Sequence, residues 1–240
     1  GFIGRAISKK LKQNYSILEL NRKNYSNFNI NKKIYPDLGK FDVIIYCAGV
    51  SQIDKCEKNS DSTSYINYEC VNDIFNKYGY HNTQIIAFSS SHVFSGNNIL
   101  YSKFNKRFPK TTYGKQKVNL EKNIFKLNGL IIRTTKVINK NYYRFKLWSK
   151  NLQNNKSIMP VANLYVSLVY LDSLVSLVRY LIKIDYRGLE QISGRDETSY
   201  YNISLQIAKK NNYDLKLITP KYLDQKLIDF YGKHSILELT

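Results

Sequence analysis

Two side chains four residues apart, Tyr113 and Lys117, are the residues of this chain best suited to acid–base chemistry. Residues four apart on a helix share one face, so the lysine ammonium can lie close to the tyrosine phenol. A nearby cation favours the phenolate and lowers the tyrosine pKa from about 10 toward neutral pH, where a proton donor is most useful. A hydroxyl from the upstream serine run, Ser90, could hold a substrate oxygen.

The spacing of this pair is weak as a signal when taken alone. The chain has 21 Tyr, and 37 of its 240 residues are Lys or Arg, so a tyrosine followed by a lysine four positions later also arises by chance. A bare motif match is a hypothesis whose structural context must agree with it. The context required here is a strand that ends at the serine and a nucleotide-binding turn upstream.

The apolar pattern supplies that context. Runs of strand length alternate with helical patterns, which is typical of βαβ units around a parallel sheet. β-branched runs such as 43–45, 85–86 and 131–132 are typical of strands covered on both faces. We predict strands at 16–20, 42–47, 83–89, 129–134, 164–169, 188–194 and 215–219. We predict helices at 5–13, 61–78, 111–127, 142–152, 172–181 and 200–210.

The first residues, Gly1 to Gly4, resemble half of a dinucleotide-binding turn. Such a turn has three glycines between a strand and a helix, for a tight turn, close phosphate approach and close helix packing. Only the last two glycines are present, and a helix follows at once. We therefore expect a fragment whose first strand and first glycine would precede residue 1. The alternative is that Gly1 and Gly4 are ordinary turn glycines.

Charge and composition restrict the class of protein. The net charge of +19 comes from basic residues spread along the chain, with no single basic tract, so no nucleic-acid partner is expected. The positive field favours an anionic ligand such as a nucleotide sugar or a phosphorylated cofactor. The three cysteines lack metal-ligand spacing, and no run reaches membrane-span length. We predict a soluble, cytoplasmic protein with no metal and no membrane contact, and a homodimer is allowed.

Several stretches in order resemble the extended short-chain dehydrogenase/reductase family, and most closely its branch of dTDP-4-dehydrorhamnose reductases and related nucleotide-sugar reductases and epimerases. The stretches are 1–4, 41–51, 54–57, Asn67, 89–96, Tyr113 with Lys117, and 132–134. Segment 166–172 resembles the return strand of the family, although Ser167 and Leu168 depart from it. The resemblance implies a Rossmann-type doubly wound parallel sheet over 1–135, with its first strand missing, and a small C-terminal substrate lobe over 136–240.

The resemblance also implies an NADP or NAD cofactor. The turn of Gly1, Phe2, Ile3 and Gly4 would approach its pyrophosphate, where backbone donors and the helix dipole favour an anion. Three residues at a strand end would line the adenine ribose, namely Cys47, Ala48 and Gly49. Arg22 stands where relatives that use NADP place a basic residue, which favours NADP; the alternative is a solvated loop charge.

In the implied reaction, hydride passes from the nicotinamide to a sugar keto carbon while Tyr113 protonates the developing alkoxide. Lys117 would lower the tyrosine pKa and hold the nicotinamide ribose, and Ser90 would bind the same oxygen. Ser89 and Ser91 stay open as alternatives to Ser90 by one step of register. Ser91 and His92 would contact the substrate, and they replace the Asp-Glu pair of the 4,6-dehydratases, so dehydration is not expected.

The sequence thus favours an NAD(P)-dependent reductase of a nucleotide-activated 4-keto-deoxysugar. A nucleotide-sugar epimerase with tightly held NAD shares the same three residues and stays open, as does a non-catalytic regulatory relative. Gln116 replaces the serine that is common before the lysine, and Lys136 stands where this branch often has an aromatic residue or proline. These departures leave the identity of the sugar open.

Overall fold

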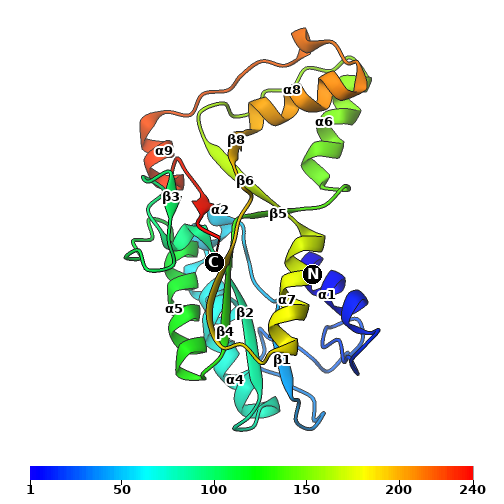
Figure 1. The fold of residues 1–240 in the computed structure, drawn as a ribbon, viewed down its shortest axis with the longest axis vertical. Helices are drawn as coiled ribbons and strands as arrows, with labels where there is room; N and C mark the ends of the chain where they lie inside the picture. Colours follow the sequence, from blue (N-terminus) through cyan, green and yellow to red (C-terminus); the bar gives the residue numbers. More distant parts are fainter. Residues whose placement is uncertain (240) are drawn as a thin grey trace.

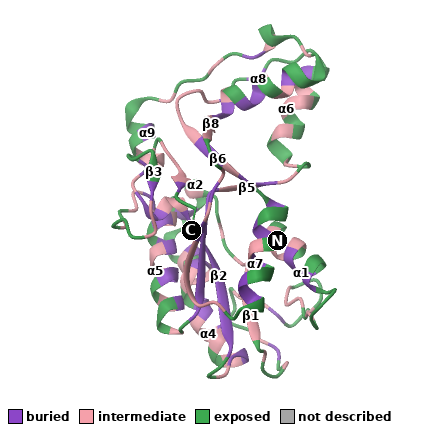
Figure 2. Cartoon of the chain, viewed as in Figure 1, coloured by how far each residue is buried: buried purple, intermediate pink, exposed green. Residues whose placement is uncertain are grey.

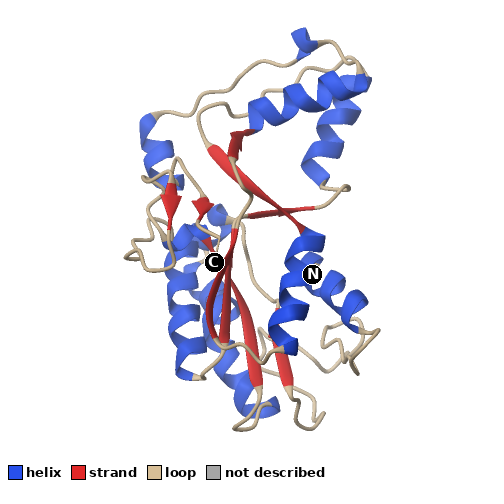
Figure 3. Ribbon diagram, viewed as in Figure 1, coloured by secondary structure: helices blue, strands red, loops and turns tan. Residues whose placement is uncertain are grey.

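The computed structural model describes residues 1–239. Its main sheet has four parallel strands in the order β1 (Val43–Tyr46), β2 (Gln84–Ser90), β4 (Leu130–Thr134) and β7 (Gly188–Ile192). Figure 1 and Figure 3 show these strands running side by side. Ser90 pairs with Thr134 in the ladder, so β2 and β4 end level with each other. The carboxyl ends of parallel strands are where ligands bind in open α/β sheets.

Helices cover both faces of this sheet (Figure 1). On one face α1 (Phe2–Leu11) and α7 (Leu171–Lys183) pack on a core that includes Ile86 and Ile132. On the other, α4 (Cys70–Tyr78) and α5 (Thr112–Lys126) pack on Ile85 and Ile131. Side chains of successive strand residues point to opposite faces, so a continuous apolar run fills both cores. Figure 2 shows that the two central strands, β2 and β4, are buried along their length, and the predicted Rossmann-type doubly wound sheet is confirmed.

A second group of elements lies beyond the carboxyl ends of the sheet. It contains α6 (Tyr143–Gln153), α8 (Tyr200–Asn211) and a three-stranded sheet of β5 (Lys136–Ile138), β6 (Tyr165–Tyr170) and β8 (Glu197–Ser199). β6 pairs parallel to β5 and antiparallel to β8. From the same half of the chain, α7 packs against α1 and β7 pairs with β4, so this half also completes the first layer. The domain boundary at residue 135 stays a prediction.

The remaining elements are short and lie mostly near the boundary between these two groups. They are α2 (Ile53–Lys58), α3 (Ser60–Ser64), a π-helical turn (Tyr65–Glu69), two 3-10 turns (Ser91–Val93 and Leu215–Leu217), β3 (Leu100–Tyr101), α9 (Gln225–Tyr231) and β9 (Ile236–Leu237). β3 and β9 pair in parallel, so the end of the described chain lies beside the segment that follows β2. Within residues 1–239, no helix has the length and apolar character needed to cross a bilayer.

Two predicted strands are wrong. Segment 16–20 is irregular, and its apolar pattern reflects packing instead, with Ile17 against the α1 face and Leu20 against the α4 face. Segment 215–219 begins as a 3-10 turn, because the side chain of Asp214 accepts a hydrogen bond from the amide of Lys216. Such a local cap competes with strand formation.

The predicted helix at 61–78 is present, but the π-helical turn at Tyr65–Glu69 interrupts it. π-helical turns inside helices are frequent at functional sites. Here the turn contains Asn67, whose side chain is fully buried and contacts the loop after β1. The other predicted helices and strands are confirmed within a few residues.

Candidate active site

A cleft of about 1170 Å³ opens at the carboxyl ends of β1 and β2 and continues into the second group of elements. Most of the residues predicted for catalysis and ligand binding line this cleft. They are Gly1, Phe2, Ile3, Cys47, Ala48, Gly49, Ser90, Ser91, His92, Tyr113 and Lys117. Residues far apart in the sequence therefore share one site, as the predicted function requires.

Ser90 and Tyr113 come together at the end of β2. Ser90 is the last residue of that strand and accepts a 3.3 Å hydrogen bond from the backbone amide of His92, while its side chain also hydrogen-bonds Tyr113. Tyr113 lies in the first turn of α5, which Thr111 caps by accepting a 3.0 Å hydrogen bond from the amide of Gly114. The cap fixes where the helix begins and thus where the phenol points.

Lys117 lies one turn further along α5 and is 7% exposed. Its Nζ donates a 2.9 Å hydrogen bond to the carbonyl oxygen of Phe88 and lies 5.7 Å from the centre of the Tyr113 ring. The predicted proximity of ammonium and phenol ring is therefore present. Burial lowers the pKa of Lys117 to about 8, and the negative charge of the nearby Glu121 opposes this lowering.

The expected effect of Lys117 on the acidity of Tyr113 is absent from this structure. Burial raises the pKa of Tyr113 to about 12, and the hydrogen bond with Ser90 is what opposes this rise. Desolvation of the phenolate outweighs a cation that hydrogen-bonds the strand carbonyl rather than the phenol. Tyr113 is therefore a protonated phenol at neutral pH.

His92 lies beside Tyr113, with the two rings edge to face at 5.8 Å between centres. Burial, together with the nearby charge of Lys136, lowers the pKa of His92 to about 4. The imidazole is thus neutral at physiological pH and can donate or accept hydrogen bonds without carrying charge. Ser91 also lines the cleft, in the 3-10 turn that carries His92.

The first turn of α1 forms one wall of the cleft. No side chain caps this helix and no acidic residue lies in its first turn, so its backbone amides and its dipole are available to an anion. A Cβ on Gly4 would come within 3.2 Å of the Cβ of Cys47, which shows how closely α1 approaches the end of β1. Gly4 itself packs there and is not among the lining residues.

Arg22 does not join the cleft. It is exposed in the turn at 21–24 and is absent from the lining of the cleft, so its predicted place beside a 2′-phosphate stays a prediction. Its surroundings in the turn are polar, with Asn21 accepting hydrogen bonds from the amides of Lys23 and Asn24.

Sequence reasoning missed a polar network that holds the loop after β1. The amide side chain of Asn67 accepts a 2.7 Å hydrogen bond from the amide of Val50 and donates to the carbonyl of Val50 and to Gln116. Gln116 in turn donates to Thr63 and Ser64. A Cβ on Gly49 would come within 3.3 Å of Asn67 and 3.9 Å of Lys117 Nζ. Asn67 and Gln116 are both buried and hydrogen-bond each other, but the periodicity of the sequence does not reveal that these two residues meet.

The far wall of the cleft is basic and aromatic. Lys136 Nζ lies 5.7 Å from the centre of the Tyr142 ring, and the guanidinium of Arg144 lies 4.8 Å from that of Tyr200. None of the described residues that line the cleft is Asp or Glu. The electrostatic character of the cleft therefore suits a ligand with negative charge. Over residues 1–239, no group of His, Cys, Asp and Glu could hold a metal ion.

The fold and the cleft define a nucleotide-binding class of protein with a serine, a tyrosine and a lysine at one strand end. The chain belongs to the RmlD substrate binding domain family, which matches residues 1–226. This confirms the predicted family resemblance. Among curated proteins, none matches the chain significantly.

Solved structures share the fold at low sequence identity. A dTDP-4-dehydrorhamnose reductase from Bacillus anthracis, in complex with NADP, superposes with a TM-score of 0.83 at 21% identity, covering 99% of this chain and 86% of that one. A dTDP-4-dehydrorhamnose reductase from Clostridium acetobutylicum superposes with a TM-score of 0.80 at 22% identity, again covering 99% of this chain and 86% of that one. A UDP-glucose 4-epimerase from Thermotoga maritima superposes with a TM-score of 0.76 at 16% identity, covering 100% of this chain and 87% of that one.

Proposed function

We propose that this protein is an NAD(P)-dependent oxidoreductase that reduces the 4-keto group of a nucleotide-activated deoxysugar. The observation that carries the proposal is the meeting of Ser90, Tyr113 and Lys117 in one cleft, which the first turn of α1 also lines. The family assignment and the likeness in fold to reductases that act on dTDP-4-dehydrorhamnose support the same chemistry.

In this mechanism the nicotinamide cofactor, when bound, supplies the hydride. Tyr113 donates its phenolic proton to the oxygen of the keto group as that oxygen gains negative charge, which its pKa of about 12 permits at neutral pH. The hydroxyl of Ser90 lies next to Tyr113 and, turned from the phenol to the substrate, donates its one hydrogen to the same oxygen. Lys117, 5.7 Å from the centre of the phenol ring, supplies a positive charge at neutral pH that can offset the negative charge developing in the cleft, although in this structure it does not lower the pKa of Tyr113.

The residues present fit a dinucleotide. The uncapped first turn of α1 presents backbone amides to a pyrophosphate, and Ala48 and Gly49 provide a wall of small residues beside it. Lys117 faces the same part of the cleft and can hold the ribose next to the nicotinamide. These contacts suit NADP and NAD alike, and Arg22 favours NADP only as a prediction.

The basic wall of the cleft is suited to the diphosphate of a nucleotide sugar. Lys136 and Arg144 both line the cleft and belong to the second group of elements. Aromatic side chains accompany them, which suits stacking on a base or a sugar. Ser91 and His92 also line the cleft, with His92 beside Tyr113 and near the charge of Lys136, and we propose that they contact the sugar.

The test is turnover of dTDP-4-dehydrorhamnose with NADPH, followed as loss of cofactor absorbance. Tyr113→Phe removes the proton donor, and we expect a loss of about 10²- to 10⁴-fold in kcat with NADPH binding retained. Tyr180→Phe is the control, because that tyrosine is exposed on α7. Undiminished turnover in Tyr113→Phe would contradict the proposal. NAD that copurifies with the protein, with no reductase activity, would instead support an epimerase.

We also propose that the protein works in the cytoplasm. We propose further that it has no nucleic-acid partner, because its basic residues are spread along the chain. Retardation of DNA or RNA by the protein at physiological salt would contradict the second part of this proposal.

A further inference from the structure

A buried carboxylate, Glu121, lies one helical turn beyond Lys117 on α5 and has no solvent exposure. Its Oε1 accepts hydrogen bonds of 2.6 Å from Ser89 Oγ and 2.8 Å from Arg133 Nε. Its Oε2 accepts bonds of 2.8 Å from Arg133 and 3.0 Å from Arg107. A fully buried carboxylate is therefore met by two arginines and a hydroxyl.

These contacts keep Glu121 ionised. Burial alone would raise the pKa of this carboxyl, but the hydrogen bonds and charge of Arg133, with Ser89 and Arg107, hold it below its usual value. The pair with Arg133 has two parallel bonds, and this arrangement fixes direction as well as distance. A buried ion pair is weak evidence for a gain in stability. The position of this pair in the fold says more about its role.

The place of the pair is at the strand ends that carry the site. Ser89 and Arg133 are ladder partners on β2 and β4, one residue before Ser90 and Thr134. Glu121 on α5 thus connects the helix to both strands, one residue before Ser90 on β2. Lys117 adds a second tie from the same helix face, through the carbonyl of Phe88.

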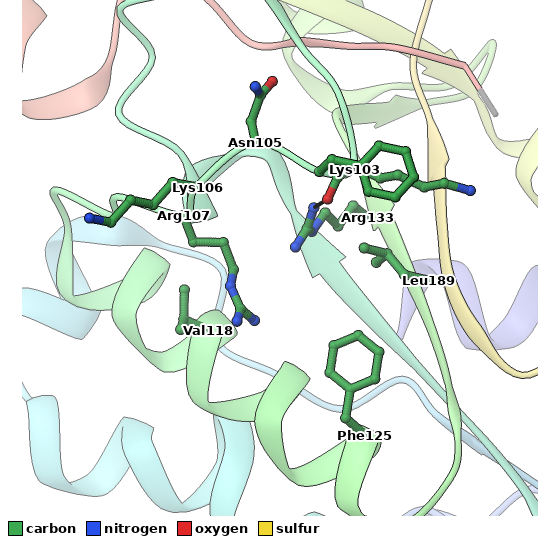
Figure 4. A pocket seen from close by; sticks show the side chains of 9 residues that line it. Lys103, Asn105, Lys106, Arg107, Val118, Phe125, Arg133 and Leu189 are labelled. Carbon is green, nitrogen blue, oxygen red and sulfur yellow. Dashed lines mark hydrogen bonds between the residues drawn. The ribbon is translucent and has the colours of Figure 1, made fainter.

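The outer side of the cluster opens onto a second pocket, of about 500 Å³, which shares no lining residue with the cleft. Figure 4 shows Arg107 and Arg133 reaching it from the loop after β3 and from β4. Ser89 lines the cleft on the inner side. Glu121 therefore lies between the two cavities and joins a residue of one to residues of the other.

We propose that Glu121, held by Arg133, is a positioning residue that sets the placement of Tyr113 and Lys117 against Ser90. This rests on the proposed function. Residues 113, 117 and 121 recur every four positions and share one face of α5, so a shift of the helix at Glu121 moves the phenol as well. A misplacement of 1 Å can cost about a hundredfold in rate.

The charge of Glu121 also acts on Lys117. The groups that face the ammonium are Cys47 after β1, Cys56 on α2 and Glu121 on its own helix, and Glu121 is the carboxylate among them. Burial raises the pKa of both thiols and keeps them neutral, so the negative charge of Glu121 is what opposes the lowering of the Lys117 pKa by burial. The same residue therefore holds the helix in place and favours the charged form of the lysine.

Two variants separate geometry from charge. Glu121→Gln keeps the shape and removes the charge, and we expect kcat to fall about 10- to 100-fold with KM for NADPH within about twofold. The Lys117 pKa, followed by NMR of labelled lysine, should fall as well. Arg133→Lys keeps a positive charge but loses the two-bond geometry, so kcat should fall while the Lys117 pKa changes little.

Ile124→Val is the matched control, because Ile124 is fully buried on the same helix and has no polar link to the strand ends. It should lower the melting temperature and leave both the Lys117 pKa and kcat near their wild-type values. The proposal is overturned if Glu121→Gln keeps kcat and the Lys117 pKa, or if Ile124→Val reproduces its effects. The NMR readout needs no substrate, so it tests the effect of Glu121 on Lys117 even if the proposed reaction fails.

Discussion

The carbonyl oxygen of His92 occupies the space that a side chain on Gly114 would need. A Cβ built on this glycine would come within 2.2 Å of that oxygen and 3.0 Å of Pro109. The first turn of α5 therefore packs directly on the backbone of the 3-10 turn after β2. This contact brings Tyr113, the residue before the glycine, next to Ser90, the residue before that turn.

Gly114→Ala should lower both activity and stability. In an ordinary helix interior this change is favourable by about 0.5–1 kcal/mol, because glycine loses more backbone freedom on folding. Here the neighbour is backbone, so the helix or the turn must move, and the distance between Tyr113 and Ser90 changes with it. We expect kcat to fall by about 10²-fold. Lys115→Ala, at the next and exposed position, is the control for kcat and melting temperature.

The activity should decline above about pH 8, as Lys117 loses its proton. Its folded-state pKa of about 8 lies below the ordinary 10.5, so the ammonium charge beside Tyr113 is lost from about pH 8 upward. Between pH 8 and 10.5 Lys117 holds more protons in the unfolded chain than in the folded one. The contribution of this group to the free energy of unfolding therefore increases as pH rises through that range. The measurement is kcat/KM for NADPH against pH, which reports the free enzyme.

Lys117→Arg tests the assignment of that decline. Arginine keeps its charge across the range, so whatever activity remains should lose the decline near pH 8. Lys115→Arg, at an exposed position of the same helix, should keep it. A decline near pH 8 that persists in Lys117→Arg would show that another group titrates there.

The sheet and the main site were predictable because each rests on a local pattern. The β-branched runs at 85–86 and 131–132 could be buried only between two helical layers, and the serine run at the end of such a strand had to lie at the ligand-binding edge. Segments 16–20 and 215–219, which we predicted as strands and which are not strands, each have three apolar residues of five. In one no ladder partner is present, and in the other a side-chain cap at Asp214 decides the local conformation.

The polar supports of the site were beyond sequence reasoning. In the sequence Gln116 is only a departure from a serine, whereas in the structure its amide hydrogen-bonds both Asn67 and Thr63 of the interrupted helix. Likewise Glu121 looks like any helix glutamate until its distance from Arg133 is known. Hydrogen bonds between residues 12 to 49 positions apart depend on tertiary placement, which periodicity does not encode.

Gln116→Ser should therefore destabilise the protein, although serine is the residue expected at this position from the family. The shorter side chain cannot reach Asn67, which is fully buried, and an unsatisfied buried group costs about 1–3 kcal/mol. For a chain of this size that corresponds to a fall of about 2–4 °C in Tm per kcal/mol. NADPH binding should weaken too, because Asn67 holds Val50 beside Gly49.

Thermal melting and NADPH titration measure these two effects. Lys115→Ser, at the neighbouring exposed position of α5, is the control for helix propensity. If Gln116→Ser melts and binds like this control, the network around Asn67 has no role in holding the loop after β1.

Arg144→Gln should weaken the nucleotide sugar more than the cofactor. Arg144 lies on α6, on the far wall of the cleft, and none of the lining residues there or elsewhere in the described cleft is acidic. Removing one charge-assisted contact with a diphosphate costs about 1.5–3 kcal/mol, equivalent to roughly 10- to 100-fold in KM for dTDP-4-dehydrorhamnose. KM for NADPH should stay within about twofold. Lys146→Gln removes an exposed charge from the same helix without a place in the cleft, and it should leave both constants unchanged. Equal effects of the two variants would mean that the general positive field, and not Arg144 itself, attracts the substrate.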